Sequence, residues 1–437
     1  MCTRTSCPTI PVAFLGAVLF SCVAVAPARA ANPKPYAGQT INVVYTTPAP
    51  PATALAQFTA QTGIRVQWVN LGYDELQTKI TAASVAHSYF ADVTDVDWSR
   101  VGQYYRLKWF TPLNGYINTA ALKSDVPQLS SFIENGTLVG MPSDSSFTVT
   151  TVNVQDFQRA GIKTMPRTFA DYNADLTRLQ TTKVMANPLD IPFAAAEGLS
   201  TYWYQMTAAF GGTMLDKSFN PLFTSPQSAG YRALVWMVNA YKSGLTPKAN
   251  INMADEEAMQ GEMALGRVST IFSDYAGQVD SIYNVHGSSH VIGQVQYIAT
   301  PGVTGPAPNL GNPDGIGIPA GAHNPGAAAA FIQWFDDPTN QANWAGLSGS
   351  KGAIATFPLP MRLSSLQMLT RAGRLTQGAL LVELLQHHAQ AAFPNGIPPW
   401  YTQFSASVNT NIHSAALGAE SPDDAIKAIA QTVNSLR

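Results

Sequence analysis

Apolar and polar positions alternate with two different periods along the N-terminal part of the chain. Residues 41–45 form a mostly apolar run typical of a buried strand, and residues 64–69 alternate as a half-exposed strand does. Residues 54–62 and 76–83 carry apolar side chains at helical spacing, and residues 91–97 predict a third strand. The order strand, helix, strand, helix, strand predicts a parallel sheet with right-handed crossovers.

Boundary signals mark further elements in the rest of the chain. An Asn-Gly pair lies between short apolar runs within residues 132–141, which predicts a hairpin. The Thr-x-x-Asp pattern of residues 168–171 resembles a helix capping box, and Ser-Pro at 225–226 and at 421–422 predicts two more helix starts. Residues 301–319 are rich in Gly and Pro, so they favour a loop or a crossing over a long element.

The N-terminus has the pattern of a secretory signal. Arg4 precedes an uncharged stretch over residues 10–26, and Ala-Arg-Ala at 28–30 supplies an A-x-A cleavage pattern. We therefore expect residues 1–30 to be a signal peptide that is cut after Ala30, with the mature protein in the periplasm. A buried N-terminal helix and a membrane anchor are the alternatives.

Cysteine usage agrees with this reading and adds one complication. All three cysteines lie within the expected signal peptide, so its removal would exclude disulfides, thiolate catalysis and zinc–thiolate sites. However, Leu-Phe-Ser-Cys at residues 19–22 resembles a loose lipobox. A protein that is lipid-anchored at Cys22 is therefore the alternative mature form.

The charge balance narrows the classes of partner. The chain has 25 basic and 27 acidic residues, and charged residues make up 12% of it, against a usual ~25%. This argues against binding nucleic acid or anionic lipid by bulk charge. A polar but weakly charged surface suits neutral hydroxylated ligands, and 437 residues predict about two to three domains.

Recognisable catalytic motifs are missing from the sequence. It contains no P-loop, no H-E-x-x-H and no G-x-S-x-G. Residues 315–320 match G-x-G-x-x-A in form, but Pro319 stands where a helix would have to open. His387 and His388 are adjacent and would point in different directions on a helix. We therefore expect no cofactor, no metal and no enzymatic activity.

Five groups of short motifs occur in one order along the chain. The first is F-x-x-x-T-G-I-x-V at 58–66, and the second is Asp-Val-Thr-Asp-Val-Asp-Trp at 92–98 with Trp-Phe-Thr-Pro-Leu at 109–113. The other three lie at 140–142 with 151–153, 160–162 and 166–169; at 211–212 with 244–247 and 266–267; and at 393–395 with 421–425. Together they resemble the extracellular solute-binding proteins of family 1, the maltose-binding-like receptors of sugar ABC importers.

The resemblance implies a periplasmic-binding-protein-like fold of type II, with two α/β lobes joined by three crossovers around a ligand cleft. We expect residues 31–144 and 300–349 in the N-terminal lobe, and residues 145–299 and 350–437 in the C-terminal lobe. The crossovers are expected near 142–146, 297–301 and 349–353.

The same resemblance implies a function. We expect a monomeric substrate-binding protein that captures a neutral mono- or oligosaccharide and delivers it to an inner-membrane ABC permease complex. The closed form would be reached by hinge bending. No nucleic-acid partner is expected.

Candidate ligand contacts follow from where strands end and where crossovers are expected. Open α/β sheets bind ligands at the carboxyl ends of their strands, and sugars are held by stacked aromatic rings and by polar groups around the ring. The candidates are Tyr45, Thr46, Asp97, Trp98, Ser143, Asp144, Ser146, Glu197, Tyr202, Asp274, Tyr275, Asn312, Asp314 and Trp400.

Several of these residues also have an ordinary structural interpretation. The aromatic side chains suit core packing, and the carboxylates at 97, 144 and 314 suit helix or turn caps. The aromatic residues at 202–204 cannot all face a ligand from one helix.

Two other functions stay open at this stage. A receptor for another polar metabolite would need basic residues for a glycerol phosphoester, or several carboxylates for a polyamine, while a polyol would need neither. An exported glycosidase would need two carboxylates ~5–10 Å apart, for which Asp97 and Asp274 are the candidates.

Overall fold

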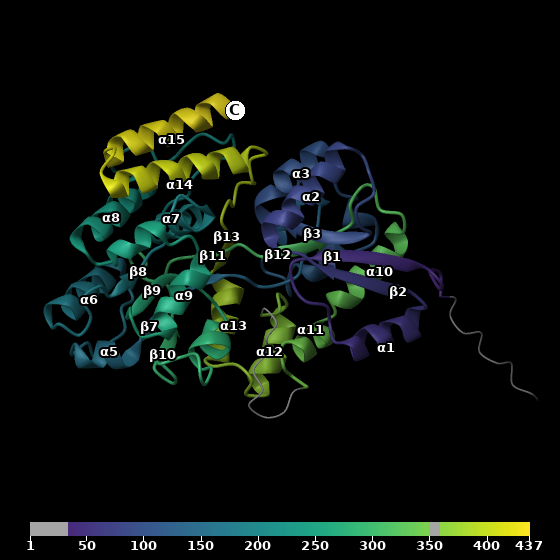
Figure 1. The fold of residues 1–437 in the computed structure, drawn as a ribbon, viewed down its shortest axis with the longest axis horizontal. Coiled ribbons are helices and arrows are strands. Elements are labelled where there is room, and N and C mark those ends of the chain that lie inside the picture. The colour runs from purple at the N-terminus through teal and green to yellow at the C-terminus, as the bar shows by residue number, and fades with distance from the viewer. Residues whose placement is uncertain (1–33, 349–358) are drawn as a thin grey trace, which may run out of the picture. The chain divides into compact units, whose positions relative to one another are not determined.

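The structure is a computed structural model that describes residues 34–348 and 359–437. Tyr36–Arg437 form the larger of two compact units of the chain. In its described residues, the larger unit contains two mixed β-sheets with helices around each (Figure 1). Every helix of the described residues is too short or too polar to span a lipid bilayer.

The first sheet has a parallel part and an antiparallel edge. Its strand order is β2 (Arg65–Asn70), β1 (Thr40–Tyr45), β3 (Val93–Asp97), β12 (Asp314–Gly317) and β6 (Met141–Pro142). β1 pairs in parallel with β2 and β3, as the alternating pattern predicted, while β12 runs antiparallel to β3 and β6. β3 is buried along its whole length, so its carboxyl end emerges from the core at Asp97.

Helices from the N-terminal part of the chain and from residues 325–344 surround this sheet. They are α1 (Ala52–Thr62), α2 (Tyr73–Val85), α3 (Val101–Leu107), α4 (Thr119–Leu122), α10 (Pro325–Phe335) and α11 (Pro338–Trp344). Phe58 of α1 packs against Phe331 and Trp334 of α10, with ring centroids 5.5 and 4.9 Å apart. Gly63 ends α1 with φ 78°, a left-handed conformation that glycine adopts without strain.

The second sheet has the order β10 (Val295–Ile298), β7 (Thr148–Asn153), β9 (Thr270–Tyr275) and β8 (Leu189–Asp190). β7 is antiparallel to both of its neighbours, and β8 is parallel to β9. A further strand pair is formed by β11 (Asn309–Gly311) and β13 (Ala389–Ala391).

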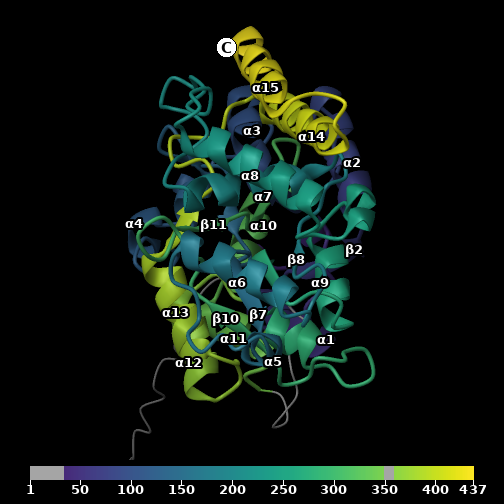
Figure 2. The ribbon, with the colours of Figure 1, turned by 90° about the vertical axis from the view of Figure 1, so that its left-hand side faces the viewer.

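The helices of this half come mainly from the middle and the end of the chain. They are α5 (Val154–Arg159), α6 (Phe169–Thr181), α7 (Glu197–Ala209), α8 (Ala229–Ser243), α9 (Glu256–Ala264), α12 (Leu363–Arg371), α13 (Gly378–His387), α14 (Tyr401–Leu417) and α15 (Pro422–Leu436). α14 and α15 lie side by side, and α14 also contacts α7 (Figure 2).

Two local predictions are confirmed. β4 (Ile133–Glu134) and β5 (Thr137–Leu138) form the predicted hairpin, with Asn135 and Gly136 at φ 46° and 78° in the turn. The side chain of Thr168 accepts a hydrogen bond from the backbone N–H of Asp171, which completes the predicted capping box of α6.

The chain passes between the two sheets at positions that partly match the expectation. It leaves the first sheet after β6 and enters the second at β7, close to the expected 142–146. It returns between β11 and β12, later than the expected 297–301. The delay arises because Asn309 donates hydrogen bonds to the carbonyl of Thr148 at 2.6 Å and to Thr300 at 2.9 Å, which keeps this stretch on β7. The third expected crossover, 349–353, lies outside the described residues.

Candidate functional site

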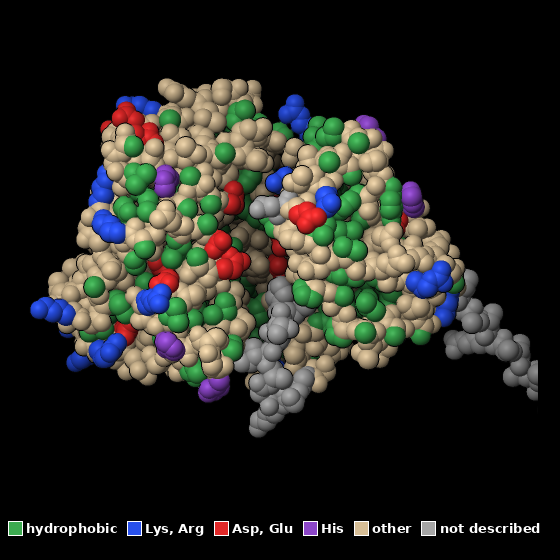
Figure 3. All heavy atoms as spheres, in the orientation of Figure 1, with side chains coloured by type: hydrophobic (Ala, Val, Ile, Leu, Met, Phe, Trp, Pro, Cys, Tyr) green, Lys and Arg blue, Asp and Glu red, His purple; other side chains and the backbone are tan. Residues whose placement is uncertain are grey.

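A cleft of about 1200 Å³ is lined by residues from both halves of the fold. From the first sheet and its helices come Thr47, Tyr73, Asp97, Trp98, Ser99 and Asp314. Asp144, Ser146 and Asn312 come from the two crossings, and Glu197, Thr201, Asp255, Glu256, Glu257 and Tyr275 come from the second half. Figure 3 shows acidic side chains gathered along the hollow in this face.

The end of β3 supplies the first part of the site. Asp97 begins a 3₁₀ turn, Trp98–Arg100, and its Oδ1 accepts a hydrogen bond from the N–H of Ser99 at 2.6 Å. Its Oδ2 accepts a hydrogen bond from the hydroxyl of Tyr73. Asp97 is therefore a turn cap and also lines the cleft, so the two interpretations of this residue are compatible.

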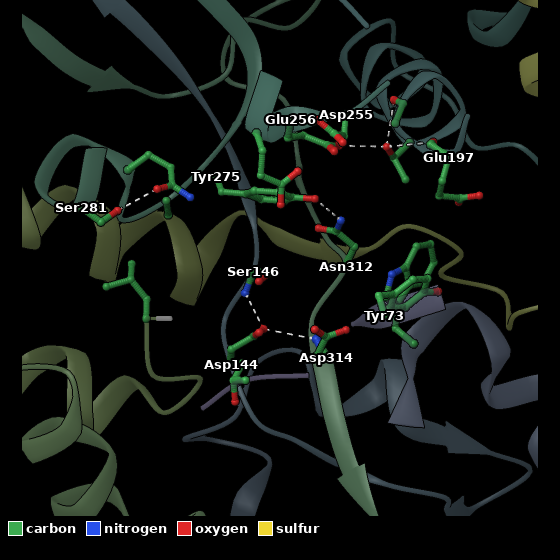
Figure 4. A pocket seen from close by; sticks show the side chains of 18 of the residues that line it. Tyr73, Asp144, Ser146, Glu197, Asp255, Glu256, Tyr275, Ser281, Asn312 and Asp314 are labelled. Atoms are coloured by element: carbon green, nitrogen blue, oxygen red, sulfur yellow. Dashed lines mark hydrogen bonds between the residues drawn. The ribbon is translucent and has the colours of Figure 1, made fainter. Parts of the chain in front are cut away.

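A pair of carboxylates, Asp144 on the first crossing and Asp314 at the start of β12, lies beside Asp97. Asp314 is the register partner of Asp97 on the antiparallel strand β12. Oδ1 of Asp144 accepts hydrogen bonds from the N–H groups of Ser146 and Asp314, at 3.0 and 3.3 Å (Figure 4). We call Asp144 and Asp314 the floor pair.

Like charges crowd the floor pair. Burial raises the pKa of Asp144 to about 6. Burial, and then the charges of Asp95, Asp144 and Asp97, raise the pKa of Asp314 well above its usual range. The carboxyl of Asp95 lies behind them, fully buried, with a raised pKa for the same reasons.

Helix N-termini of the second half supply the opposite side, which we call the helical wall: Glu197, Asp255 and Glu256. Glu197 opens α7 and accepts hydrogen bonds from the hydroxyls of Tyr401 and Ser405. Asp255 caps α9 by accepting from the N–H of Ala258 at 3.0 Å. Glu256 accepts from Thr201 at 3.1 Å, and burial raises its pKa to about 7.

Aromatic groups complete the lining. The hydroxyl of Tyr275, at the end of β9, accepts a hydrogen bond from the amide nitrogen of Asn312 at 2.6 Å. Trp98 stacks on Phe393, with centroids 6.4 Å apart, and meets the edge of Tyr401 at 5.4 Å. Trp98 is only 6% exposed, so it is part of the core as well as of the cleft lining.

The structure brings a subset of the candidates predicted from the sequence together in this cleft. They are Asp97, Trp98, Asp144, Ser146, Glu197, Tyr275, Asn312 and Asp314. Whether each of them contacts a ligand stays a prediction.

The remaining candidates do not line this cleft. Tyr45 and Ser143 bond to each other through their hydroxyls at 2.5 Å, below the cleft surface. Thr46 is not part of the cleft lining, whereas the next residue, Thr47, is. Tyr202 is buried and donates to the carbonyl of Asp190 at 3.2 Å.

Asp274 and Trp400 are also enclosed in the second half. Asp274 is fully buried and accepts hydrogen bonds from Thr151, Gln260 and Tyr283. Trp400 packs edge-on against Phe219 and Phe404, at 5.9 and 6.2 Å.

Sequence reasoning missed several lining residues, in particular Tyr73 and the acidic triplet at 255–257. Tyr73 opens α2 directly after β2, so the rule that ligands bind beyond strand ends could have found it. The triplet has the composition of an ordinary helix start, which hides any second role.

The comparisons with known proteins agree with this geometry. The family model for bacterial extracellular solute-binding proteins matches residues 53–361. The chain therefore belongs to the bacterial extracellular solute-binding protein family, as the motif resemblance indicated. Members of this family are transport proteins outside the cytoplasm that bind small molecules and work with ABC permeases, and they are not enzymes.

Solved structures confirm the fold. A solute-binding protein from Agrobacterium radiobacter K84 in complex with ribitol has a TM-score of 0.75 at 19% identity, covering 92% of this chain and 100% of that one. A maltose-bound protein from T. maritima has a TM-score of 0.72 at 19% identity, covering 91% and 100%. The predicted type II fold with two α/β lobes is thus correct.

A curated relative is similar over a shorter stretch. It is named a probable amino-acid ABC transporter periplasmic-binding protein, from Sinorhizobium fredii strain NBRC 101917 / NGR234. It is 26% identical over 247 residues, and the match spans about half of each protein, 51% of this chain and 53% of the relative.

Proposed function

We propose that this protein is the substrate-binding component of an ABC importer, and that it captures a carbohydrate or polyol in the cleft and delivers it to a membrane permease unchanged. The observation that carries this proposal is the cleft itself, which is formed by both halves of the fold and is lined by carboxylates, amides, hydroxyls and aromatic rings. Its volume of about 1200 Å³ leaves room for a small oligosaccharide and water.

The chemistry of the lining supports a hydroxylated ligand. Carboxylate and amide groups accept and donate the hydrogen bonds that a ring of hydroxyls requires, and Trp98 and Tyr275 offer apolar surface to its C–H face. Ligands of this kind occur in the ribitol- and maltose-bound relatives. These relatives share the fold, so they support the proposal without fixing the ligand.

Ligands that carry an acidic group fit this cleft poorly. A free amino acid or a glycerol phosphoester needs a basic partner for its carboxylate or phosphate. Among the described lining residues there is no Lys or Arg, while acidic side chains stand on both sides. We therefore favour a sugar-like ligand over the amino acid that the name of the curated relative suggests.

A glycosidase is also disfavoured. The pair considered from the sequence, Asp97 and Asp274, cannot flank a glycosidic bond, because Asp274 is enclosed by Thr151, Gln260 and Tyr283. The proposal is therefore binding without turnover.

The lobe boundaries and the processing of the chain belong to the same proposal. We assign 31–144 to the N-terminal lobe and 145–299 to the C-terminal lobe, and sheet membership favours moving the second boundary from 300 to about 312. Residues after 312 up to 349 would then rejoin the N-terminal lobe, and 350–437 the C-terminal lobe. Cleavage after Ala30 and lipid anchoring at Cys22 are alternatives that concern residues outside the described part of the chain. Intact-mass analysis of protein from the native host distinguishes them. A soluble monomeric product belongs to the same proposal.

The test is a ligand screen followed by product analysis. Thermal-shift measurements with mono-, di- and trisaccharides and polyols should identify a stabilising ligand, because ligand that binds the folded protein raises its melting temperature. Mass spectrometry after long incubation should recover that ligand intact. Turnover of the ligand would replace the proposal with an enzyme, and stabilisation by amino acids alone would replace carbohydrate with amino acid.

A further inference from the structure

The cleft is far more acidic than the chain that forms it. Its described lining contains seven carboxylates, which are Asp97, Asp144, Glu197, Asp255, Glu256, Glu257 and Asp314. The same lining contains no Lys or Arg, although the whole chain is nearly balanced, with 25 basic and 27 acidic residues. With His286 as the one basic side chain of the described lining, this concentration of acidic groups favours a ligand that carries positive charge.

Most of these carboxylates already have donors within the protein. Asp97 accepts hydrogen bonds from Tyr73 and Ser99. The carboxylates of the helical wall accept hydrogen bonds from hydroxyl groups and from a helix N–H group. Glu257 is exposed in the first turn of α9. These groups are explained by the local structure, so they need no ligand.

The floor pair is different. Asp144 is only 7% exposed, and within the described chain its carboxylate accepts hydrogen bonds from the N–H groups of Ser146 and Asp314 and from the side chain of Ser146. The carboxylate of Asp314 has no protein donor there at all, and its backbone N–H is used on Asp144. Next to them, Oδ1 of Asn312 is buried without a hydrogen-bond partner. Asp144 and Asp314 lie next to each other in the cleft lining, and the side chain of Asn312 points toward Tyr275 (Figure 4).

The positive charge of the nearby Arg100 balances carboxylates other than the floor pair. Arg100 acts on Asp95, Asp97 and Glu197. It is not among the groups that influence Asp144 or Asp314, whose neighbours of like charge raise the pKa of Asp314. Nor do three His, Cys, Asp or Glu side chains of the described chain converge in the geometry of a metal site. The floor pair therefore lacks a cation, and its arrangement does not suit a metal ion.

We infer that the ligand of this cleft is an aminated saccharide, and that its protonated amino group binds between Asp144 and Asp314. An ammonium group carries three donors and a positive charge, which suit the carboxylate of Asp314, without a donor in the described chain, and the adjacent carboxylate of Asp144. A hydroxyl donates one hydrogen bond and leaves the charge uncompensated. This inference rests on the proposed function, because the saccharide body is taken from it.

The experiment compares matched ligands on the purified protein at pH 7.5. Titration calorimetry is performed with glucosamine, N-acetylglucosamine and glucose, and with the corresponding dimers: deacetylated chitobiose, diacetylchitobiose and cellobiose. Putrescine and spermidine form the non-sugar arm. We expect the free-amine saccharides to bind roughly 10- to 100-fold more tightly than their acetylated and hydroxyl counterparts. This preference should shrink as salt is added.

Two variants locate the effect. Asp144→Asn and Asp314→Asn keep the shape of the side chain and remove its charge, so each should reduce the preference for the amine by about tenfold while retaining weak saccharide binding. Glu383→Gln removes an exposed carboxylate outside the cleft lining and should leave the preference unchanged. If Asp144→Asn fails to fold, Asp314→Asn alone decides.

The outcomes separate this inference from the proposed function. Equal or tighter binding of the neutral or acetylated sugars would overturn the inference and leave the proposed function standing. Binding of polyamines without any saccharide would overturn both. Amine preference that survives both Asn variants would also overturn the inference, because the floor pair would not be its source.

Discussion

The two sides of the cleft are both acidic, but they differ in what their carboxylates do. On the helical wall, Glu197 and Asp255 accept hydrogen bonds from hydroxyls and from a helix N–H group of the chain itself. In the floor pair, the carboxylate of Asp314 receives no donor from the described chain, and Asp144 accepts hydrogen bonds from Ser146 and from the N–H of Asp314. Acidic residues that look alike in a list of lining residues therefore divide into structural groups and groups available to a ligand.

The difference follows from the elements that carry them. A helix N-terminus offers free N–H groups and a partial positive charge, so carboxylates there stabilise the fold without any ligand. The floor pair lies where a crossing meets an antiparallel strand end, and Asp314 is opposite Asp97 in register. Like charges placed opposite each other across strands destabilise a sheet. The first region thus contributes to stability, and the second costs stability.

The largest expected effects concern two tryptophans, Trp98 in the cleft lining and Trp400 outside it. Trp98 follows β3 and packs on Phe393 and Tyr401, whereas Trp400 packs on Phe219 and Phe404 away from the cleft lining. Replacing either with Ala should lower the free energy of unfolding by about 3–5 kcal/mol, because a buried aromatic ring is lost.

Only Trp98→Ala should also weaken ligand binding. Urea unfolding without ligand gives the stability change, and calorimetric titration gives the affinity change. Weaker binding by Trp400→Ala at a temperature where it is folded would contradict its placement in the core.

The second prediction concerns pH. The pKa of Asp144 is raised to about 6 from a usual value near 3.9, so the folded state binds its proton more tightly than the unfolded state does. The resulting stability is fully present below pH ~4 and is lost as pH rises through about 6, by up to ~3 kcal/mol. The facing groups Asp95, Asp97 and Asp314 are acidic, so none of them reverses this sign.

Other buried carboxylates, such as Glu256, shift in the same direction, so the measurement is a difference. Urea unfolding of wild type and Asp144→Asn from pH 4 to 8 should show a gap that widens with pH in favour of the variant. Parallel curves would contradict the assignment.

The third prediction tests the helical wall. Glu197→Ala should destabilise the protein by about 1–3 kcal/mol, because the buried hydroxyls of Tyr401 and Ser405 lose their acceptor. Glu197→Gln keeps an acceptor oxygen and should cost less. Both are compared with wild type by urea unfolding at pH 7.5. An Ala variant as stable as wild type would remove the structural role of this residue.

The smallest prediction has the opposite sign. Asp314→Asn should stabilise the ligand-free protein by about 1 kcal/mol at pH 7.5, because it removes a carboxyl group whose charged form is repelled by Asp95, Asp144 and Asp97. Glu383→Gln, an exposed control, should stay within ~0.5 kcal/mol of wild type. Destabilisation by Asp314→Asn would show that the floor pair is satisfied in the ligand-free protein, and the contrast between the two regions would fail.

Local patterns predicted much of the fold because the forces behind them are local. The parallel order of β1, β2 and β3 follows from side-chain periodicity, and the capping box at Thr168 follows from short-range hydrogen bonding. Strand ends likewise led to Asp97 and Tyr275 in the cleft.

Whether a polar side chain at a strand end is buried in the core or reaches the cleft was not predictable in the same way. Asp274 precedes Tyr275 by one position, yet it points into the core, because Thr151 and Tyr283 provide donors there from other parts of the chain. The position of the second crossing depends on Asn309 reaching β7, which is also a long-range contact. Sequence periodicity carries no information about such partners.

The hydrogen bonds between the two crossings have a further consequence. Ser143 donates its N–H to the carbonyl of Asp314 at 2.8 Å, and Asp314 donates back to Asp144 at 3.3 Å, so the segments that connect the halves are laced to each other at the residues that line the cleft. The residues proposed to bind the ligand therefore lie on the segments that connect the two halves. We expect a substitution in these connecting segments to change ligand selectivity and the equilibrium between open and closed forms together. A substitution on the helical wall should change selectivity alone. We therefore expect new specificities in related proteins to arise on the helical wall, with the laced crossings kept as a common joint.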